Sequence, residues 1–102
     1  MRSRQMMQTK LETLLGSRNV YFAPPESVKM KYPCFVYNYS RFSTRRANDK
    51  AYTVIPHYDV TYISKDPDSG MIERMLEAYE MCSHIDSYMT ENLNHDKFDV
   101  YY

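Results

Sequence analysis

The sequence predicts an α+β fold, a single domain in which two helices pack on a mostly antiparallel sheet of about four to five strands. Residues 33–43 and 51–64 are both rich in aromatic and β-branched side chains, and a short polar segment separates them, as in a β-hairpin. Apolar residues recur at helical spacing near residues 6–15 and 71–81. With 102 residues the chain has room for one hydrophobic core, so we expect one domain over residues 1–102.

The N-terminal helix is predicted from a stripe of apolar residues and from Gly16, which follows the last of them as a C-terminal cap. Residues 19–23 ("NVYFA") are a candidate for a short strand, because two prolines follow and end it. The next segment, up to Tyr32, is expected to be a connecting loop. The apolar stripe of the helix consists of Met7, Leu11, Leu14 and Leu15.

The second strand of the hairpin shows the period-2 alternation of a strand with one drier and one wetter face. Pro56 interrupts this strand. Because proline cannot donate a ladder hydrogen bond, we expect a sheet edge or a bulge there. The drier positions are Val54, Tyr58, Val60 and Tyr62, and the wetter ones are His57, Asp59 and Thr61.

A turn with the sequence "DPDSG" joins this strand to the second helix. We expect Asp66 or Asp68 to cap the helix by accepting hydrogen bonds from free backbone N–H groups, with Pro67 at the first helical position. The helix is expected to cover residues 70–81 and to end before Cys82. Its buried face is expected to contain Ile72, Met75, Leu76 and Tyr79.

Two further strands are predicted at the C-terminal end. Residues 83–90 and 95–102 have the composition of strands, and residues 91–94 ("ENLN") link them. The predicted order is therefore helix, short strand, two long strands, helix and two strands.

Composition narrows the classes of function. Basic and acidic residues both number 13, so no net charge attracts the whole chain to nucleic acid or to an acidic membrane. No apolar stretch approaches the roughly 20 residues that span a bilayer, and no membrane partner is expected. The N-terminal residues lack the pattern of a signal peptide, so we expect synthesis and reduced cysteines in a cytoplasm. The 11 tyrosines fit strand positions or surfaces that a partner buries.

Three histidines have a nearby aspartate, which is the first place to look for catalysis or metal binding. Side chains two apart in a strand share a face, but such pairs also arise by chance, and the spacing matches no metal motif. Solvated or hydrogen-bonded strand residues are the favoured interpretation, with no enzyme activity, catalytic residue, metal or cofactor predicted. A small oligomeric hydrolase or nuclease that uses His57 with Asp59 stays open as an alternative. The pairs are His57 with Asp59, His84 with Asp86, and His95 with Asp96.

Basic residues gather around the predicted tip of the long hairpin. In a single copy they are typical of a solvated loop, and a DNA-binding regulator is the weakest alternative, because no helix carries a basic stripe. In a ring of subunits the same charges would surround one axis, where they could line a DNA passage or meet an acidic partner ring. These basic residues are Arg41, Arg45, Arg46 and Lys50.

Two parts of the chain resemble the tail-completion or tail-terminator proteins of long-tailed bacteriophages, also described as minor capsid or head–tail joining proteins. The similar features are the Tyr-Pro start of residues 32–76, the turn "ANDKAYT", the "DPDS" joint, and the ending "TENLNHDKFDVYY". Together they cover roughly the last two-thirds of the chain, and none is a catalytic signature.

The resemblance implies a structural virion protein that forms a homo-oligomeric ring, usually a hexamer, at the head–tail junction. Such a ring ends the tail tube and joins it to the head connector, so the implied partners are further copies, the tail tube protein, the connector or stopper protein and DNA in the lumen. The closest alternative is a connector stopper or adaptor of the same junction. In this interpretation the hairpin arginines face the lumen or an adjoining ring, and Tyr37 and Tyr58 help subunit contacts.

Overall fold

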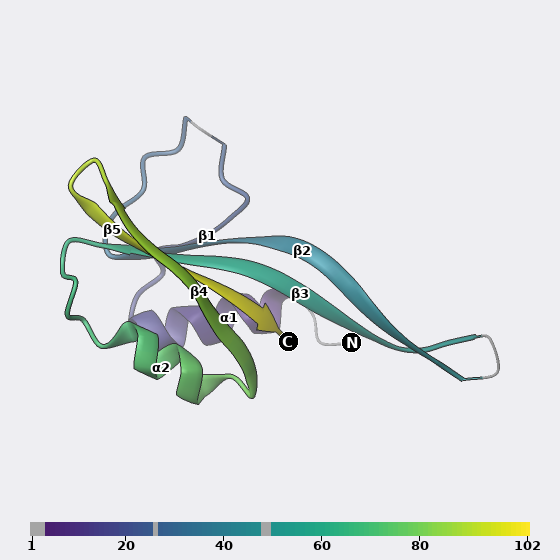
Figure 1. Cartoon of the computed structure of the whole chain (residues 1–102). Helices are drawn as coiled ribbons and strands as arrows, with labels where there is room; N and C mark the ends of the chain where they lie inside the picture. Colours follow the sequence, from purple (N-terminus) through teal and green to yellow (C-terminus); the bar gives the residue numbers. More distant parts are fainter. Residues whose placement is uncertain (1–3, 26, 48–49) are drawn as a thin grey trace.

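The computed structural model confirms the α+β prediction, with two helices on a five-stranded, mostly antiparallel sheet (Figure 1). It describes residues 4–25, 27–47 and 50–102. No helix within these ranges is long and apolar enough to cross a lipid bilayer. The elements are α1 (Arg4–Leu15), β1 (Val20–Phe22), β2 (Cys34–Ala47), β3 (Lys50–Ser64), α2 (Met71–Ala78), β4 (Met81–Thr90) and β5 (Leu93–Tyr101).

The strands follow the order β1-β2-β3-β5-β4, so β3 is central and β1 and β4 form the two edges. Every neighbouring pair is antiparallel except β1 with β2, which is parallel. Tyr37 of β2 lies opposite Val60 of β3, which lies opposite Phe98 of β5. These three side chains lie on the face that α1 and α2 cover, called the helix side below (Figure 1). The opposite face is called the open side.

The main core lies between the helix side of the sheet and the two helices. α1 contributes the fully buried Met7 and Leu11, as the apolar stripe predicts, and α2 contributes Met71 and Met75. Leu14 and Leu15 pack against the core while only partly buried. The sheet contributes the alternate residues Phe35, Tyr37, Tyr58, Val60, Tyr62, Phe98 and Val100.

A second, smaller core lies on the open side, near the end of the sheet where β1 joins β2. Cys34, Ile63 and Leu93 are buried there, and Met30 from the loop after β1 packs against them. This loop therefore covers one end of a face that is otherwise largely free of helices (Figure 1).

The start and end of α2 correct two predictions. Gly70, with φ of 75°, occupies the cap position, and the Ser69 hydroxyl rather than an aspartate accepts the N–H of Met71 at 3.4 Å. Asp66 instead accepts the N–H of Asp68 at 2.9 Å within the preceding turn. The helix ends at Ala78 because Tyr79 already has extended backbone angles, so Cys82 lies in a strand rather than at a helix end.

The predicted apolar face of α2 is also partly wrong. Leu76 is 43% exposed, while Met71, outside the predicted face, is buried together with Met75. The shorter helix is rotated so that the Met71–Met75 pair, one turn apart, faces the sheet.

The last two strands are confirmed, joined by a tight turn. Glu91 and Asn92 have φ values of 53° and 63°, both in the left-handed region. Two such residues form the kind of turn whose twist matches an antiparallel hairpin, and asparagine tolerates this backbone conformation. β4 thus ends directly before this pair, and β5 begins directly after it.

The long hairpin extends further than predicted. Residues 44–50 are expected as a polar loop, but residues 44–47 and Lys50 continue the ladder up to the pair Ala47 and Lys50, while residues 48–49 lie outside the described ranges. The part of β2 and β3 beyond the other strands, residues 38–47 and 50–56, is called the arm below. It projects well past the helices, and the molecule measures 51 × 29 × 23 Å (Figure 1).

Pro56 lies where β3 loses its β5 neighbour, as the prediction of a sheet edge requires. The backbone N–H of Tyr102 donates to the Pro56 carbonyl at 3.1 Å. Because the N–H and C=O of a strand residue point to the same neighbour, the N–H that proline lacks would also face β5. The β2–β3 ladder therefore loses no hydrogen bond at Pro56.

Two buried tyrosine hydroxyls differ in a way that stability measurements can resolve. The Tyr37 hydroxyl donates to the side-chain oxygen of Gln8 and accepts from Arg4 at 3.3 Å, whereas the buried Tyr79 hydroxyl finds no hydrogen-bond partner among the described residues. Tyr37→Phe should lower the free energy of unfolding by about 1 kcal/mol, because it breaks a made bond. Tyr79→Phe should leave the stability unchanged or raise it, because it removes an unsatisfied group.

Urea denaturation of both variants and of the unaltered protein measures this difference. The two changes delete the same atom from the same residue type, so each serves as the control for the other. Equal destabilisation by both substitutions would contradict the assignment of the hydrogen bonds.

Candidate functional site

A bulge in β2 sets the arrangement of side chains at the root of the arm. Tyr39 lies opposite Tyr58, but Arg41 lies opposite His57, so Ser40 is an extra residue in β2. A one-residue insertion reverses the faces that follow it. After the bulge, Arg41 and Ser43 therefore lie on the open side.

On the helix side, a chain of aromatic rings leads from the core onto the arm. The rings of Phe22 and Tyr39 are 5.5 Å apart, Tyr39 stacks on Tyr58 at 5.1 Å, and Phe42 lies 5.2 Å from Tyr39. Tyr39 and Phe42 are 41% and 51% exposed. The apolar surface thus continues beyond the point where the helices cover it, which is typical of a surface that a partner buries.

On the open side, polar groups tie the arm to the C-terminal strand. The Arg41 guanidinium donates to the Tyr101 hydroxyl at 3.3 Å, and the Tyr101 ring lies 3.6 Å from the His57 ring. The His57 Nε2 atom shares a hydrogen bond with the Ser43 hydroxyl. These contacts join β2, β3 and β5 at one place, so they hold the direction of the arm relative to the sheet.

The predicted contact residues lie in different surroundings from those expected. Arg41 is exposed at the root of the arm, not near its tip, because the strands are longer than predicted. Tyr37 and Tyr58 are fully buried within the chain, so neither side chain is available on its surface. The exposed aromatic groups are their neighbours Tyr39 and Phe42. The side chains of Arg45, Arg46 and Lys50 lie outside the described part of the structure.

The geometry of His57 and Asp59 does not match an acid–base pair. His57 is only 1% exposed, and its Nδ1 atom is buried without a hydrogen-bond partner, so Asp59 does not orient the ring. Asp59 is exposed on the open side. A substrate would therefore reach the carboxylate but not the imidazole, which lies beneath Tyr101.

His84 does not pair with Asp86 as predicted, because a second bulge, at Ile85, separates them. Instead the Nε2 atom of His84 lies 2.9 Å from the Ser87 hydroxyl and 3.5 Å from an Asp96 carboxylate oxygen, and Ser87 donates to that oxygen. In a Ser-His-Asp relay the serine and the aspartate bind opposite ring nitrogens. Here both meet the same nitrogen, so this cluster fits cross-strand hydrogen bonding rather than nucleophilic catalysis.

The structure also bears on the third candidate pair, His95 with Asp96, and on metal binding. The His95 ring stacks on Tyr88 at 4.8 Å, and its Nδ1 atom lies 3.1 Å from the Leu93 carbonyl, so Asp96 is not its partner. Within the described ranges, no group of three or more His, Cys, Asp or Glu side chains is arranged to hold a metal ion.

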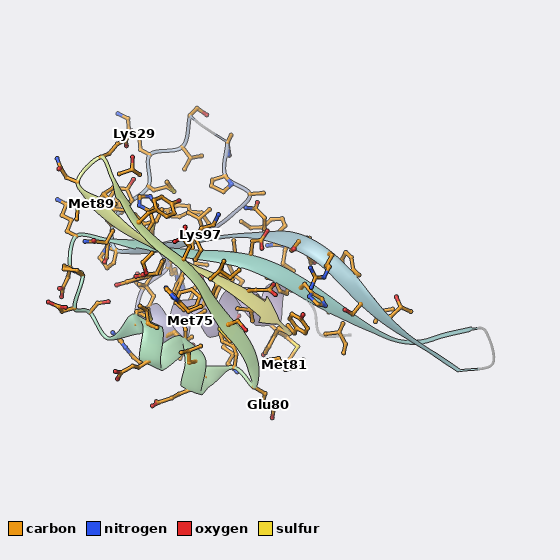
Figure 2. All side chains as sticks on the ribbon, viewed as in Figure 1. Lys29, Met75, Glu80, Met81, Met89 and Lys97 are labelled. Atoms are coloured by element: carbon orange, nitrogen blue, oxygen red, sulfur yellow. The ribbon has the colours of Figure 1, made fainter. Side chains whose placement is uncertain are left out.

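The edge strand β4 carries a feature that the sequence reasoning missed. Met81, Ile85 and Met89 are 52%, 59% and 64% exposed. Figure 2 shows Met81 and Met89 at the two ends of β4, with Glu80 directed outward beside Met81. Their spacing of four residues is a multiple of two, so strand alternation alone would place all three on one face, and this apolar row was the signal available in the sequence. The bulge at Ile85 instead leaves Met81 and Met89 on opposite faces.

A cleft of 410 Å³ lies between the root of the arm and the end of α2. Its walls are mostly apolar or aromatic, with Lys10 and Glu80 as the charged contributors. The apolar and aromatic lining includes Val54, Ile55, Pro56, Tyr79, Met81 and Tyr101. The cleft therefore lies between the two surfaces already described, the arm and the edge strand, and it can accept apolar side chains.

Both cysteines are poorly suited to act as nucleophiles. Burial raises the pKa of the Cys34 thiol to about 11. Burial, with the nearby Asp99 carboxylate as the smaller cause, also raises the pKa of the Cys82 thiol to about 11. Because the thiolate is the reactive form, both thiols stay protonated and inert at neutral pH.

The raised pKa values predict slow thiol chemistry in the folded protein. At pH 8 the thiolate fraction of each cysteine should be about a hundredfold below that of an ordinary thiol, so reaction with a disulfide reagent should be correspondingly slow. The contribution of the two thiols to the free energy of unfolding should be constant below about pH 8 and fall as the pH rises through 9 toward 11, because the unfolded thiols release protons that the folded ones retain. The reaction rate and a series of urea titrations measure both effects. The chain unfolded in guanidinium is the control, and rapid reaction of the folded protein would contradict the assignment.

Comparison with known proteins adds no relative. No protein-family model matches the chain, and no curated protein matches it. The candidate functional site is therefore defined by geometry alone. It consists of the arm with its exposed aromatic residues and the apolar edge strand β4.

Proposed function

We propose that this chain is a structural, non-enzymatic virion protein that forms a ring, a hexamer in the resembling family, at the head–tail junction of a long-tailed bacteriophage. The ring ends the tail tube and joins it to the head connector. The single observation that carries the proposal is the arm, which extends past the helices with unpaired backbone along both sides.

A two-stranded ribbon is marginally stable by itself in water, because it has no opposing layer on which to bury side chains. The arm nevertheless exposes Tyr39 and Phe42, and its root is fixed to β5 through Tyr101. A rigidly aimed ribbon with exposed aromatic groups is suited to lie on a neighbouring molecule. Contact by every arm with the next subunit is the arrangement that a ring requires.

The resemblance of residues 32–76 and of the C-terminal "NLNHD" segment supports the choice of assembly. The turn between Glu91 and Asn92 and the joint that includes Asp66 and Asp68 are features of backbone geometry, so the similar residues specify structure rather than chemistry. Such similarity agrees with a function that surfaces perform. In this proposal the tip of the arm, with Arg46 and Lys50, faces the lumen or the adjoining ring, with DNA as the further contact, while Arg41 and Arg45 lie along the edge of the arm that is available to a neighbouring subunit.

A connector stopper or adaptor is the alternative at the same junction, and microscopy distinguishes the two. The protein is mixed with tail tubes of its phage and, separately, with heads that lack tails, and both are imaged by negative stain. We expect caps on the ends of the tubes. Binding to the head vertex alone would identify the protein as a connector stopper or adaptor. Binding to neither structure would contradict the proposal.

Shortening the arm tests the observation behind the proposal. In the variant, Asn-Gly replaces residues 44–54, so that a two-residue turn connects Ser43 and Ile55, which already lie opposite each other. We expect a folded protein with a thermal midpoint within a few degrees of the original, because the core lies elsewhere. Tube capping should fall at least tenfold. Full capping by the shortened protein would show that the arm is dispensable.

A control variant separates the arm from surface changes in general. Val28→Ser alters an exposed apolar residue of the loop after β1, away from the arm and from β4. We expect it to cap tubes like the unaltered protein.

A further inference from the structure

We infer that the outer edge of β4 in one copy pairs with the arm edge of β2 in a second copy, so that the sheet continues from subunit to subunit. This inference rests on the proposed self-assembly and specifies its contact. It identifies which edges meet, which the resemblance does not.

Both edges offer backbone groups that the chain itself leaves unpaired. β1 pairs with β2 only as far as Tyr37, so the outer side of β2 from Asn38 to Ala47 faces no strand among the described residues. β4 is the last strand in the sheet, and within the described ranges no strand lies beyond it. Unpaired edges of this kind template pairing with another chain unless charges or proline block them. β4 contains no proline, lysine or arginine.

The two edges agree in length and in charge. β4 has 10 residues, and the unpaired part of β2 covers residues 38–47. By sequence, residues 38–47 contain three arginines and no acidic residue, whereas residues 80–91 contain three acidic residues and no lysine or arginine. The other arm strand is a poorer match, because its unpaired part, residues 50–56, is shorter and carries only Lys50. Opposite charges of this kind select one edge against another.

The side chains also match on each face. Arg41 lies on the open side of β2, and Asp86, opposite Lys97 of β5, lies on the open side of β4. On the helix side, Phe42 is exposed on the arm and Met89 on β4. If the sheet continues into the second copy with its helix side on the same face, oppositely charged side chains lie together on the open side. Apolar side chains then lie together on the helix side.

The contact has to be made between copies and is head-to-tail. β2 and β4 lie on opposite sides of β3 and β5 in the strand order, so the two edges of one chain cannot meet. Because each copy offers one edge of each kind, every copy binds two neighbours. Such a contact closes into a ring when the rotation between neighbours allows it.

Charge reversal on each edge, followed by mixing, tests the pairing. The arm variant carries Arg41→Glu with Arg45→Glu, and the edge variant carries Glu80→Lys with Asp86→Lys. Each variant alone presents like charges at the contact, so self-association in sedimentation velocity should weaken at least tenfold at low salt. An equimolar mixture should recover assembly, because the reversed arm meets the reversed edge and the two unaltered edges meet each other.

Two control variants carry the same charge changes elsewhere. Lys29→Glu with Lys31→Glu alters the exposed loop after β1, and Glu73→Lys with Glu77→Lys alters the exposed side of α2. Both should assemble like the unaltered protein. Thermal unfolding of all four variants checks that each is folded.

The inference is overturned if the arm variant assembles normally. Such a result would indicate a contact that does not involve the arm, such as pairing between two β4 edges. It is also overturned if the mixture assembles no better than its components, or if the unaltered protein stays monomeric at every concentration and on tail tubes. The proposed function fails separately. Recovery of assembly by mixing, without caps on tubes or binding to heads, would support the edge pairing and reject the head–tail role. Caps formed equally by all variants would support the head–tail role and reject the edge pairing.

Discussion

Backbone pairing along β3 determines the shape of this protein and the location of its candidate contacts. β3 pairs with β2 over nearly its whole length but with β5 only from His57 to Ser64. The sheet therefore narrows from five strands to two at Pro56, where the C-terminal residue donates its N–H to the last shared carbonyl. Residues before Pro56 have only β2 as a neighbour, so the arm follows directly from the difference in strand lengths.

Within the core, a few directed hydrogen bonds add to packing and fix α1 to the sheet beside the root of the arm. The Tyr37 hydroxyl accepts a hydrogen bond from Arg4 and donates one to the side-chain oxygen of Gln8. The amide nitrogen of Gln8 donates to the Val20 carbonyl at 3.0 Å, so α1 is fixed to both β1 and β2. Tyr58 lies beside Tyr37 and stacks on Tyr39, and burial, with the neighbouring Tyr39 side chain as the smaller cause, raises the pKa of its hydroxyl. One tyrosine thus positions a helix, while its neighbour supports the aromatic surface of the arm, which shows why residue type alone does not assign a role.

Much of the fold could be predicted because local patterns determine it. Alternation in β3 identified the buried Tyr58, Val60 and Tyr62. The link between the last two strands was predicted over residues 91–94, and the turn itself is shorter, because β5 begins at Leu93. Features that depend on a neighbouring strand could not be predicted. The bulges at Ser40 and Ile85 become visible only when two strands are set side by side, and each reverses the faces after it. For the same reason His84 and Asp86 looked like a pair in the sequence. Tyr37 and Tyr39 share the helix side, and the sequence could not separate them because only the extent of the helices decides which of the two is covered.

A net charge of zero conceals an uneven distribution along the chain. The acidic stretch around β4 and the basic stretch of the arm balance each other in the total, yet they lie on opposite edges of one sheet. Within one subunit this separation brings no stabilisation, since the two edges are too far apart in the strand order to interact strongly across screening solvent. The separation becomes favourable only when a second copy brings an acidic edge to a basic arm. In the proposed edge pairing, the two unlike edges of this chain, which cancel in total charge, are complementary to each other on separate copies.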